Sequence, residues 1–565
     1  MIIIDRNIIV FLSFYQPIQV IMKTIVAIIF TLLYCQFGFA QYDLLPTDFL
    51  SKDFHKERRE ELRKKMPNNS VAVFFANPVR NRANDVDYVY HQDPNFYYLT
   101  GYKEPHAVLL IFSENQIVGN NNYNEVIYVQ ERNKREEQWT GKRLGVEGVK
   151  EKLDFTNAFN GSEFVKATID YKSFNKVLIF DFKDDYRNSG RNNADLFDLV
   201  SHFKSSASYD KNLLPDPDRL RAYELIKATT IENSANVAQN LGRYLDYFPE
   251  LKEDELLQGY QTAATDELRK EFKQKISLKL EAKSKTNINN VALGELMGSL
   301  REIKLPEEIK LLKKAINISA IGQIEIMKAM HPNMSETEIQ GVHEFVYKKY
   351  GAEYEGYPSI VGGGHNGCIL HYVENNKTKV GNDLVLMDLG AEYRGYTADV
   401  TRTIPANGKF STEQKAIYDI VYEAQEAGIA AVTVGSTFTA SHKATRKVVN
   451  EGLYKLGIIK SIDEHHDYYP HGSSHHIGLD VHDPGNSGEF KANMVLTVEP
   501  GIYIPENSNC DEKWWGIAVR IEDDILVTEK GPINLSKKAP RKSDEIEKLM
   551  QEASVLNAFK LPDLD

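Results

Sequence analysis

Short apolar runs separated by turn residues mark the first part of the chain. They cover residues 71–75, 96–99 and 107–112, and a similar run follows at 177–180. Runs of this length bounded by turns are typical of strands buried in a small domain. We therefore expect an α/β lobe that ends near residue 183.

A polar, helix-patterned stretch follows this lobe, from residue 184 to about 295. Its lysine-rich part, residues 269–285, also carries scattered glutamates. Mixed charges of this kind usually belong to a solvated helix face rather than to a binding site. We interpret residues 184–295 as a helical insertion or linker.

Helix signals become sharper after residue 305. A proline followed by two acids opens a helix at Pro306, as expected for a first helical turn. Capping boxes pair Ser335 with Glu338 and Ser411 with Gln414. Apolar residues follow at helical spacing: Ile309, Leu312, Ile316 and Ala320; Ile339, Val342 and Val346; Ile417, Ile420, Val421 and Ala424.

Strand-like runs alternate with these helices. We expect strands at residues 369–373, 384–391, 396–403, 495–499 and 517–527. Hairpins mixed with helices, without strict βαβ alternation, predict an α/β (α+β) second lobe at residues 296–565.

Composition limits the classes of function. The chain has 565 residues, 42% hydrophobic and 26% charged, which is too long for one core and typical of several folded domains. Its net charge of −12 argues against nucleic acid or an anionic membrane as the main partner. Three cysteines are too few for a disulfide framework.

The amino terminus has the layout of a secretory signal peptide. Residues 22–40 begin with Met-Lys, continue with an apolar stretch and end on Gly38-Phe39-Ala40. We predict a start at Met22, cleavage after Ala40 and a secreted or periplasmic protein without a membrane span in its mature chain. The alternative is an uncleaved anchor helix, which needs about 20 apolar residues. Lipidation at Cys35 is disfavoured by the bulky Tyr34 before it.

Several familiar motifs fail. Residues 362–367 fit the GxGxxG spacing but run into the strand expected at 369–373, whereas a dinucleotide fingerprint opens a helix. Tyr347 stands where a zinc-protease helix starting at His343 needs its second histidine. The GxSxG elbow of serine hydrolases does not occur in the sequence.

Two aspartates lie on either side of a turn within apolar surroundings. A two-residue turn at Tyr393 and Arg394 would place Asp388 directly opposite Asp399, with β-carbons about 4.5–5.5 Å apart. A bulge at Gly395 would shift this register. Two buried carboxylates so close need a shared proton or a cation.

Three further residues favour the cation. These are His475 in the run His471-Gly472-Ser473-Ser474-His475, Glu499 at the end of the strand-like run 495–499, and Glu522 in the run 517–527. Arg520 shares a strand face with Glu522. Four carboxylates and one imidazole suit Mn²⁺, tolerate Co²⁺ or Zn²⁺, and can hold two ions that activate a bridging water to hydroxide.

In order and context, these residues resemble the dinuclear site of the pita-bread metallopeptidases, and most of all that of the Xaa-Pro aminopeptidases (aminopeptidase P). The resemblance implies a pita-bread catalytic domain, residues 296–565, preceded by a smaller α/β aminopeptidase P (creatinase-type) N-terminal domain, residues 41–183. It rests on residues 360–362, 366–372, 478–483 and 497–501, and in the first lobe on Arg82 with Asp85, 96–101, Glu104-Pro105 and 139–141.

The resemblance also implies roles for single residues. Asp388 would hold one metal, Asp399 and Glu522 would bridge both, and His475 and Glu499 would hold the other. Glu499 would also be the general base. The family's remaining pocket residues match His371, His471 and His482, which would orient substrate, and Arg520, which would support the metal carboxylates.

Two departures from the family pattern and four other residues remain. The insertion at 184–295 is longer than the family's usual connection, and His476 replaces an aromatic residue that is frequent there. His365, His465 and His466 lie in polar loops, where solvation is commoner than metal binding. Cys368 fits an ordinary buried thiol.

The resemblance predicts a metal-dependent Xaa-Pro aminopeptidase acting on peptides with proline in second position, as a dimer or tetramer. A prolidase, which takes only Xaa-Pro dipeptides, shares every metal ligand. A non-catalytic binding module on the same fold is the alternative from another class, but such modules are expected to lose ligands.

Overall fold

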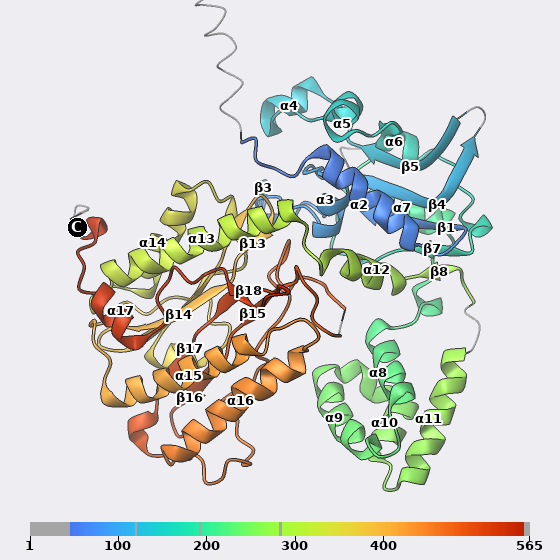
Figure 1. The fold of residues 1–565 in the computed structure, drawn as a ribbon. Coiled ribbons are helices and arrows are strands. Elements are labelled where there is room, and N and C mark those ends of the chain that lie inside the picture. Colours follow the sequence, from blue (N-terminus) through green and yellow to red (C-terminus); the bar gives the residue numbers. More distant parts are fainter. Residues whose placement is uncertain (1–45, 119–120, 191–193, 282–284, 487, 559–565) are drawn as a thin grey trace, which may run out of the picture. The chain divides into compact units, whose positions relative to one another are not determined.

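The computed structural model describes residues 46–118, 121–190, 194–281, 285–486 and 488–558 (Figure 1). The chain divides into two compact units, residues 1–49 and residues 50–565, and every helix and strand named below belongs to the second unit. The predicted signal peptide at 22–40 lies outside the described residues. Within the described ranges, no helix is both long and apolar enough to cross a membrane.

A six-stranded mixed sheet organises the first lobe, in the order β6-β5-β4-β1-β7-β8. Residues of β1 (Ser70–Phe75) face alternately: Ala72 and Phe74 pack on one side with Phe54, and Val71 and Val73 on the other with Phe203. Helices therefore cover both faces, which explains why β1 is almost wholly apolar. The other strands are β4 (Val108–Val118), β5 (Asn121–Val129), β6 (Ala158–Asn160), β7 (Lys176–Leu178) and β8 (Ile288–Asn289).

One of the apolar runs that the sequence suggested as strands forms a helix instead. Residues 96–99 lie in α3 (Pro94–Thr100), which Asp93 caps and Gly101 ends with φ 70°. The remaining elements are α2 (Lys52–Lys65), α4 (Lys134–Thr140), α5 (Gly145–Leu153), α6 (Gly161–Phe164) and the hairpin β2 (Asn81–Ala83) with β3 (Val86–Asp87).

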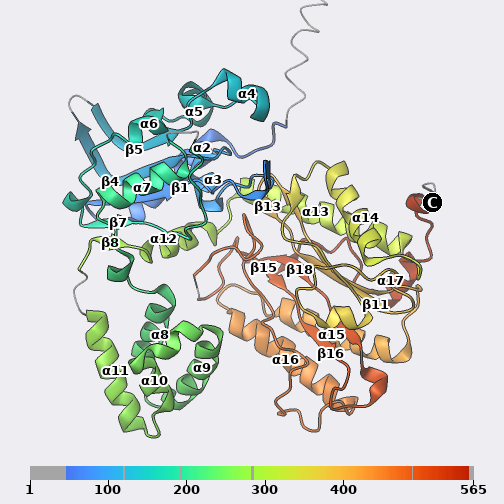
Figure 2. The same cartoon turned by 180° about the vertical axis from the view of Figure 1, so that it is seen from behind.

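The segment expected as an insertion divides into two kinds of structure. Its first helix, α7 (Leu196–Ser206), and the strand β8 at its end belong to the core of the N-terminal sheet. Between them, four helices gather around a separate apolar cluster (Figure 2). These helices, called the helical insertion below, are α8 (Pro217–Ala228), α9 (Ser234–Tyr247), α10 (Glu255–Thr262) and α11 (Asp266–Glu281). The domain boundaries at 183 and 295 stay predictions.

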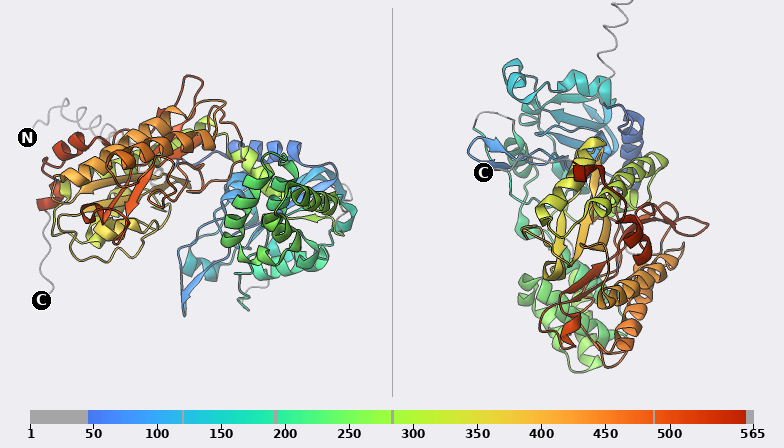
Figure 3. Two further views of the ribbon diagram at one scale, coloured as in Figure 1. Left: turned by 90° about the horizontal axis from the view of Figure 1, so that it is seen from below. Right: turned by 90° about the vertical axis from the view of Figure 1, so that its left-hand side faces the viewer.

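The predicted helices of the second lobe are confirmed. The first begins at Pro306, and the capping box at Ser411 and Gln414 is complete. At Ser335 the hydroxyl accepts from the Glu338 amide, half of the predicted box. Figure 3 shows α15 and α16 side by side, in orange. The helices are α12 (Ala292–Arg301), α13 (Pro306–Ala329), α14 (Glu336–Lys349), α15 (Thr412–Ala430), α16 (Phe438–Lys455) and α17 (Ser543–Leu549).

Short antiparallel strands form the sheets of this lobe, in the orders β10-β11-β14, β13-β12-β9, β15-β18-β19 and β16-β17. The three longest expected strands, 384–391, 396–403 and 517–527, are each broken in two. The strands are β9 (Tyr354–Glu355), β10 (Ile360–Gly363), β11 (Leu384–Leu389), β12 (Ala391–Tyr393), β13 (Tyr396–Thr397), β14 (Val400–Pro405), β15 (Val495–Val498), β16 (Gly501–Ile504), β17 (Ile517–Arg520), β18 (Asp523–Leu526) and β19 (Ile533–Asn534).

The first break has a steric cause. A β-carbon on Gly390, between β11 and β12, would lie 1.8 Å from the carbonyl oxygen of Ala398. Only glycine allows the two chains to approach so closely. The facing chain breaks at the same level, between β13 and β14.

The strand expected at 369–373 is wrong. Strand β10 runs instead into a 3₁₀ helix, Gly364–Cys368, and residues 369–373 join no ladder. The GxGxxG stretch therefore does enter a short helix, contrary to the reason given for rejecting it. The rejection still holds, because β10 pairs antiparallel with β11, which is not the parallel βαβ arrangement of a dinucleotide site.

The register expected for Asp388 and Asp399 is wrong by two residues. The turn lies at Arg394 and Gly395, whose φ angles of 54° and 87° fit a two-residue hairpin turn. Asp388 consequently faces Thr401 rather than Asp399. Asp399 itself lies in the break between β13 and β14, so strand alternation does not set the direction of its side chain.

Candidate metal centre

The predicted acidic ligands meet where the strands end or break. Asp388 lies near the end of β11, Asp399 between β13 and β14, Glu499 after β15, and Glu522 between β17 and β18. Breaks free these side chains from the strict alternation of a ladder, so that they converge from four chain segments.

His475 lies at the centre of this group. Its Nε2 atom is 3.5 Å from Asp399 Oδ2, 3.5 Å from Glu499 Oε1 and 3.9 Å from Glu522 Oε1. One ligand atom each from Asp399, His475 and Glu522 lie within 4.8 Å of one another. The structure thus brings together four of the five predicted ligands, three carboxylates and the imidazole between them.

Asp388, the fifth, joins the group through a tyrosine that the sequence reasoning missed. The hydroxyl of Tyr357 lies 2.6 Å from Asp388 Oδ1 and 2.7 Å from Asp399 Oδ1. No motif or spacing in the sequence points to Tyr357, because it comes from the segment between β9 and β10.

Arg520 hydrogen-bonds to one of the acids and to a neighbouring tyrosine. Its Nη2 donates to Asp388 Oδ2 at 2.6 Å, and its Nη1 donates to the Tyr503 hydroxyl at 2.9 Å. Thr401 donates its hydroxyl to Glu522 Oε2 at 2.6 Å. Such contacts fix the orientation of carboxylates that could hold an ion.

Burial and crowding disturb the protonation of the acids. Burial, together with the charges of neighbouring acids, raises the pKa values of Asp399 and Glu522 well above their usual range. Burial acts to raise the pKa of Asp388, but the charge of Arg520 and the hydrogen bonds from Tyr357, Arg520 and Asp399 together lower the pKa of that carboxyl. Burial raises the pKa of Glu499, against the charges of His475 and Arg520.

These residues fit divalent metal ions. Glu522 Oε1 is buried and has no hydrogen-bond partner among the described residues, although the other oxygen of the same carboxylate has one. A buried carboxylate oxygen without a donor is costly unless a cation satisfies it. Three carboxylates and an imidazole around that oxygen form the donor set that divalent metals accept.

The predicted pocket histidines differ in their surroundings. His471 contacts the Tyr503 hydroxyl at 2.8 Å through Nε2, and burial lowers its pKa to about 4. The His475 and His482 rings are 4.4 Å apart, and burial lowers the pKa of His482, with further lowering by His475 and His371. His371 is exposed and lies beyond the 3₁₀ helix.

The residues set aside in the sequence lie elsewhere. His365 pairs with Glu506, and burial raises the pKa of the Cys368 thiol to about 11, as in an unreactive thiol. His466 is not solvated as expected, because it is buried and contacts Asn450. The buried His476 ring packs edge-on against Phe438.

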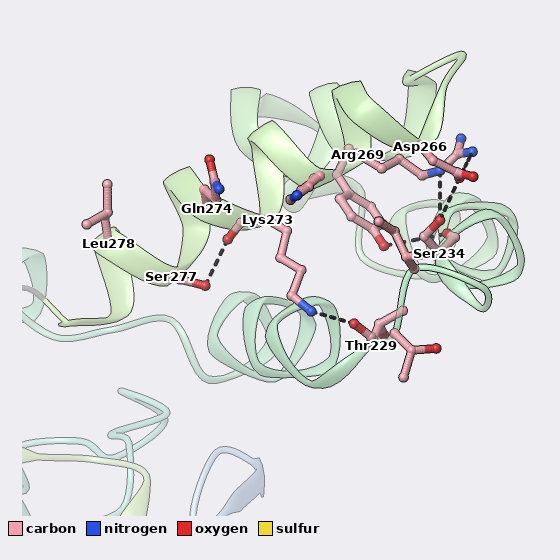
Figure 4. Close-up of a pocket in the computed structure, with 12 residues that line it drawn as sticks. Thr229, Ser234, Asp266, Arg269, Lys273, Gln274, Ser277 and Leu278 are labelled. Atoms are coloured by element: carbon pink, nitrogen blue, oxygen red, sulfur yellow. Dashed lines mark hydrogen bonds and ion pairs between the residues drawn. The ribbon is translucent and has the colours of Figure 1, made fainter.

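A separate cavity of about 510 Å³ lies in the helical insertion (Figure 4). Arg269 donates to Ser234, Ala263 and Asp266, and Lys273 donates to the Thr229 carbonyl. These polar groups are therefore already satisfied by one another, and the cavity carries none of the chemistry of the acidic cluster.

A cluster of buried acids around a histidine, set at the strand breaks of this fold, defines the class of metal-dependent hydrolases. Family comparison agrees: residues 310–529 match metallopeptidase family M24, and residues 55–178 match the aminopeptidase P N-terminal domain.

Comparison with similar proteins narrows the class of metal-dependent hydrolases to one family. Xaa-Pro aminopeptidases of Escherichia coli and Haemophilus influenzae are each 32% identical, over 89% of this chain and 98% of theirs. The structure of Escherichia coli aminopeptidase P with the inhibitor Pro-Leu has a TM-score of 0.67 at 30% identity, covering 89% of this chain and 98% of that one. The structure of Pseudomonas aeruginosa aminopeptidase PepP has a TM-score of 0.66 at 31% identity, and the match covers 89% of this chain and 99% of that one. The chain belongs to the Xaa-Pro aminopeptidase family of the M24 metallopeptidases, and the two expected domains are confirmed.

Proposed function

We propose that this protein is a metal-dependent Xaa-Pro aminopeptidase, which removes the first residue of a peptide when proline follows. The observation that carries the proposal is the convergence of Asp399, His475, Glu499 and Glu522 in a chain of this family. Relatives with this name align over almost their whole length.

The residues proposed to hold two divalent ions are Asp388, Asp399, His475, Glu499 and Glu522. Asp399 and Glu522 would bridge the ions, with Asp388 on one side and His475 and Glu499 on the other. Mn²⁺ suits the oxygen-rich donor set, and Co²⁺ or Zn²⁺ can replace it. When bound, the ions supply a Lewis acid and lower the pKa of a water molecule.

Glu499 is the proposed general base. Burial raises its pKa, so its carboxylate can take a proton from the attacking water closer to neutral pH than an exposed glutamate can. Its Oε2 lies 3.6 Å from His471 Nδ1, and Tyr503 contacts the other ring nitrogen, which fixes the ring beside it. Arg520 holds Asp388 in place.

His371 and His482 are proposed to orient the peptide and to deliver a proton to the leaving proline nitrogen. That nitrogen carries no hydrogen in the imide, so it must be protonated as the bond breaks. Because proline also restricts the preceding residue, a dedicated pocket for this bond is chemically sensible.

Our proposals for the location and the assembly of the protein rest on the sequence. We propose that the chain is secreted or periplasmic, with cleavage after Ala40, and that it acts as a dimer or tetramer. The family resemblance is the reason for proposing this assembly, and exposed apolar side chains of the first lobe are available for it: Tyr88 is 59% exposed, Val89 73% and Trp139 86%. Light scattering of the purified chain measures the assembly.

The experiment is hydrolysis of an Xaa-Pro dipeptide and an Xaa-Pro-Yaa tripeptide by protein starting at residue 41, with and without Mn²⁺. We expect metal-dependent cleavage of the tripeptide and none by the Asp399→Asn variant. Cleavage of the dipeptide alone would identify a prolidase. No cleavage of either, with metal shown to be bound, would favour a binding module.

A further inference from the structure

The segment that carries His371 has little regular structure of its own. It is called the His371 loop here and comprises residues 363–377. Its part 369–373 joins no ladder: a bend and a turn occupy residues 369–371, with His371 exposed and the next residue, Tyr372, buried. Something other than sheet pairing must therefore fix the position of His371.

Glu336, the first residue of α14, contacts this loop at several points and is fully buried. Its Oε1 accepts from the Gly363 amide at 2.7 Å and from Asn366 Nδ2 at 3.0 Å. Its Oε2 accepts from the Tyr372 hydroxyl at 2.9 Å and from the Lys377 amide at 2.8 Å. One carboxylate thus holds both ends of the loop and two points between them.

The backbone of Glu336 adds a fifth contact, because its amide donates to the Lys377 carbonyl at 3.0 Å. All four donors to its side chain are neutral groups. Burying a carboxylate is costly unless its oxygens are fully hydrogen-bonded, and here two donors reach each oxygen. The amino end of α14 also favours a negative charge at this position.

Tyr372 connects the carboxylate to the active centre. Tyr372 directly follows His371 in the chain, so the hydrogen bond from its hydroxyl to Glu336 Oε2 restrains the backbone that carries His371. The Glu336 carboxylate itself touches none of the proposed metal ligands.

We infer that Glu336 is a positioning residue, whose buried carboxylate clamps the His371 loop and so places the His371 ring for catalysis. The catalytic part of this inference rests on the proposed function. A purely architectural role is the competing explanation, since Asn375 also ties the loop to Gln340 and to Ser359.

Kinetics on the tripeptide distinguish the two roles through a double-mutant cycle. We expect Glu336→Gln to lower kcat by up to ~100-fold, since the amide cannot accept from all four donors and a displaced catalytic group costs about this much. In a His371→Ala background, the same substitution should cost less than ~3-fold, because its effect passes through His371.

Matched variants complete the kinetic test. Glu338→Gln, at an exposed position in the same helical turn, should leave kcat unchanged. Tyr372→Phe, which removes one of the four donors, should fold normally and give a smaller loss than Glu336→Gln. Full additivity of Glu336→Gln and His371→Ala would overturn the inference.

Hydrogen–deuterium exchange provides a readout that does not depend on activity. Glu336→Gln should raise exchange in peptides spanning 363–377 and leave peptides of α15 unchanged, while Glu338→Gln should alter neither. Unchanged exchange in the loop would overturn the clamp. A wild-type protein inactive on both peptides would reject the proposed function, and exchange would then decide alone whether Glu336 holds the loop.

Discussion

The metal centre and the cavity of the helical insertion are both lined by charged residues, but they are satisfied differently. In the insertion, Arg269 and Lys273 donate to nearby oxygens. In the metal centre, Glu522 Oε1 is buried without a donor among the described residues, and burial and neighbouring acids raise the pKa of its carboxyl. The difference teaches that unsatisfied crowding, rather than the presence of a cavity, marks the site of chemistry.

The strongest test of this comparison removes an acid from the crowded group. Asp399→Asn should abolish metal-dependent hydrolysis, with a loss greater than ~100-fold, which exceeds what outer contacts of a metal site contribute. It should also lower the amount of metal bound per chain, as measured by elemental analysis. Normal metal content and activity would show that Asp399 is not a ligand.

The next test leaves the acids intact and alters their support. Arg520→Lys keeps the charge but cannot contact both Asp388 and Tyr503 with the same planar group. We expect activity to fall by about 10- to 100-fold. Steady-state kinetics at saturating metal check this, and activity equal to that of the unaltered protein would contradict a role for Arg520 geometry.

His343 tests whether a buried group without hydrogen-bond partners is by itself a sign of a functional site. It is fully buried in α14, neither ring nitrogen has a hydrogen-bond partner among the described residues, and burial lowers its pKa to about 3. Below pH 6.5 His343 is protonated in the unfolded chain but stays neutral in the folded chain. The free energy of unfolding therefore falls as the pH drops from 6.5 toward 3.

The expected loss from His343 is about 2 kcal/mol at pH 5 relative to pH 8, from 1.36 kcal/mol per pH unit. Urea unfolding of the unaltered protein and of His343→Phe measures it, because phenylalanine removes the titrating group while filling similar space. Activity at pH 8 should be equal in the two. An identical pH dependence of stability would refute the assignment.

The smallest effect is expected in the helical insertion. Ser234→Ala removes the hydroxyl that accepts from Arg269 and donates to Asp266. We expect a loss of about 1 kcal/mol in the stability of this region and unchanged kcat/KM. Hydrogen exchange of α9 and α11 together with kinetics checks this. A fall in kcat/KM would show that the insertion is linked to catalysis.

Much of the fold could be predicted because it depends on local signals. Pro306 and the Ser411–Gln414 box each marked a helix start, and the structure confirms both. The ligand acids stood out because charged residues in apolar strands need a reason. These signals are carried by a few neighbouring residues, which a single sequence contains.

What failed depends on contacts between distant segments. The register of Asp388 shifted because the positive φ angles fall at Arg394 and Gly395, a detail of turn geometry. The run at 369–373 has strand-like residues but no ladder, since a bend and a turn occupy 369–371 and the Tyr372 hydroxyl donates to the Glu336 carboxylate. Tyr357 and Glu336 carry no motif, and only the folded chain shows that Tyr357 contacts Asp388 and Asp399 and that Glu336 contacts the His371 loop.

The placement of the ligands at strand breaks has an evolutionary consequence. The ladders of β15 with β18 and of β16 with β17 are made without Glu499 or Glu522. A descendant gene could therefore exchange either codon and keep its sheets, losing the enzyme while retaining the scaffold.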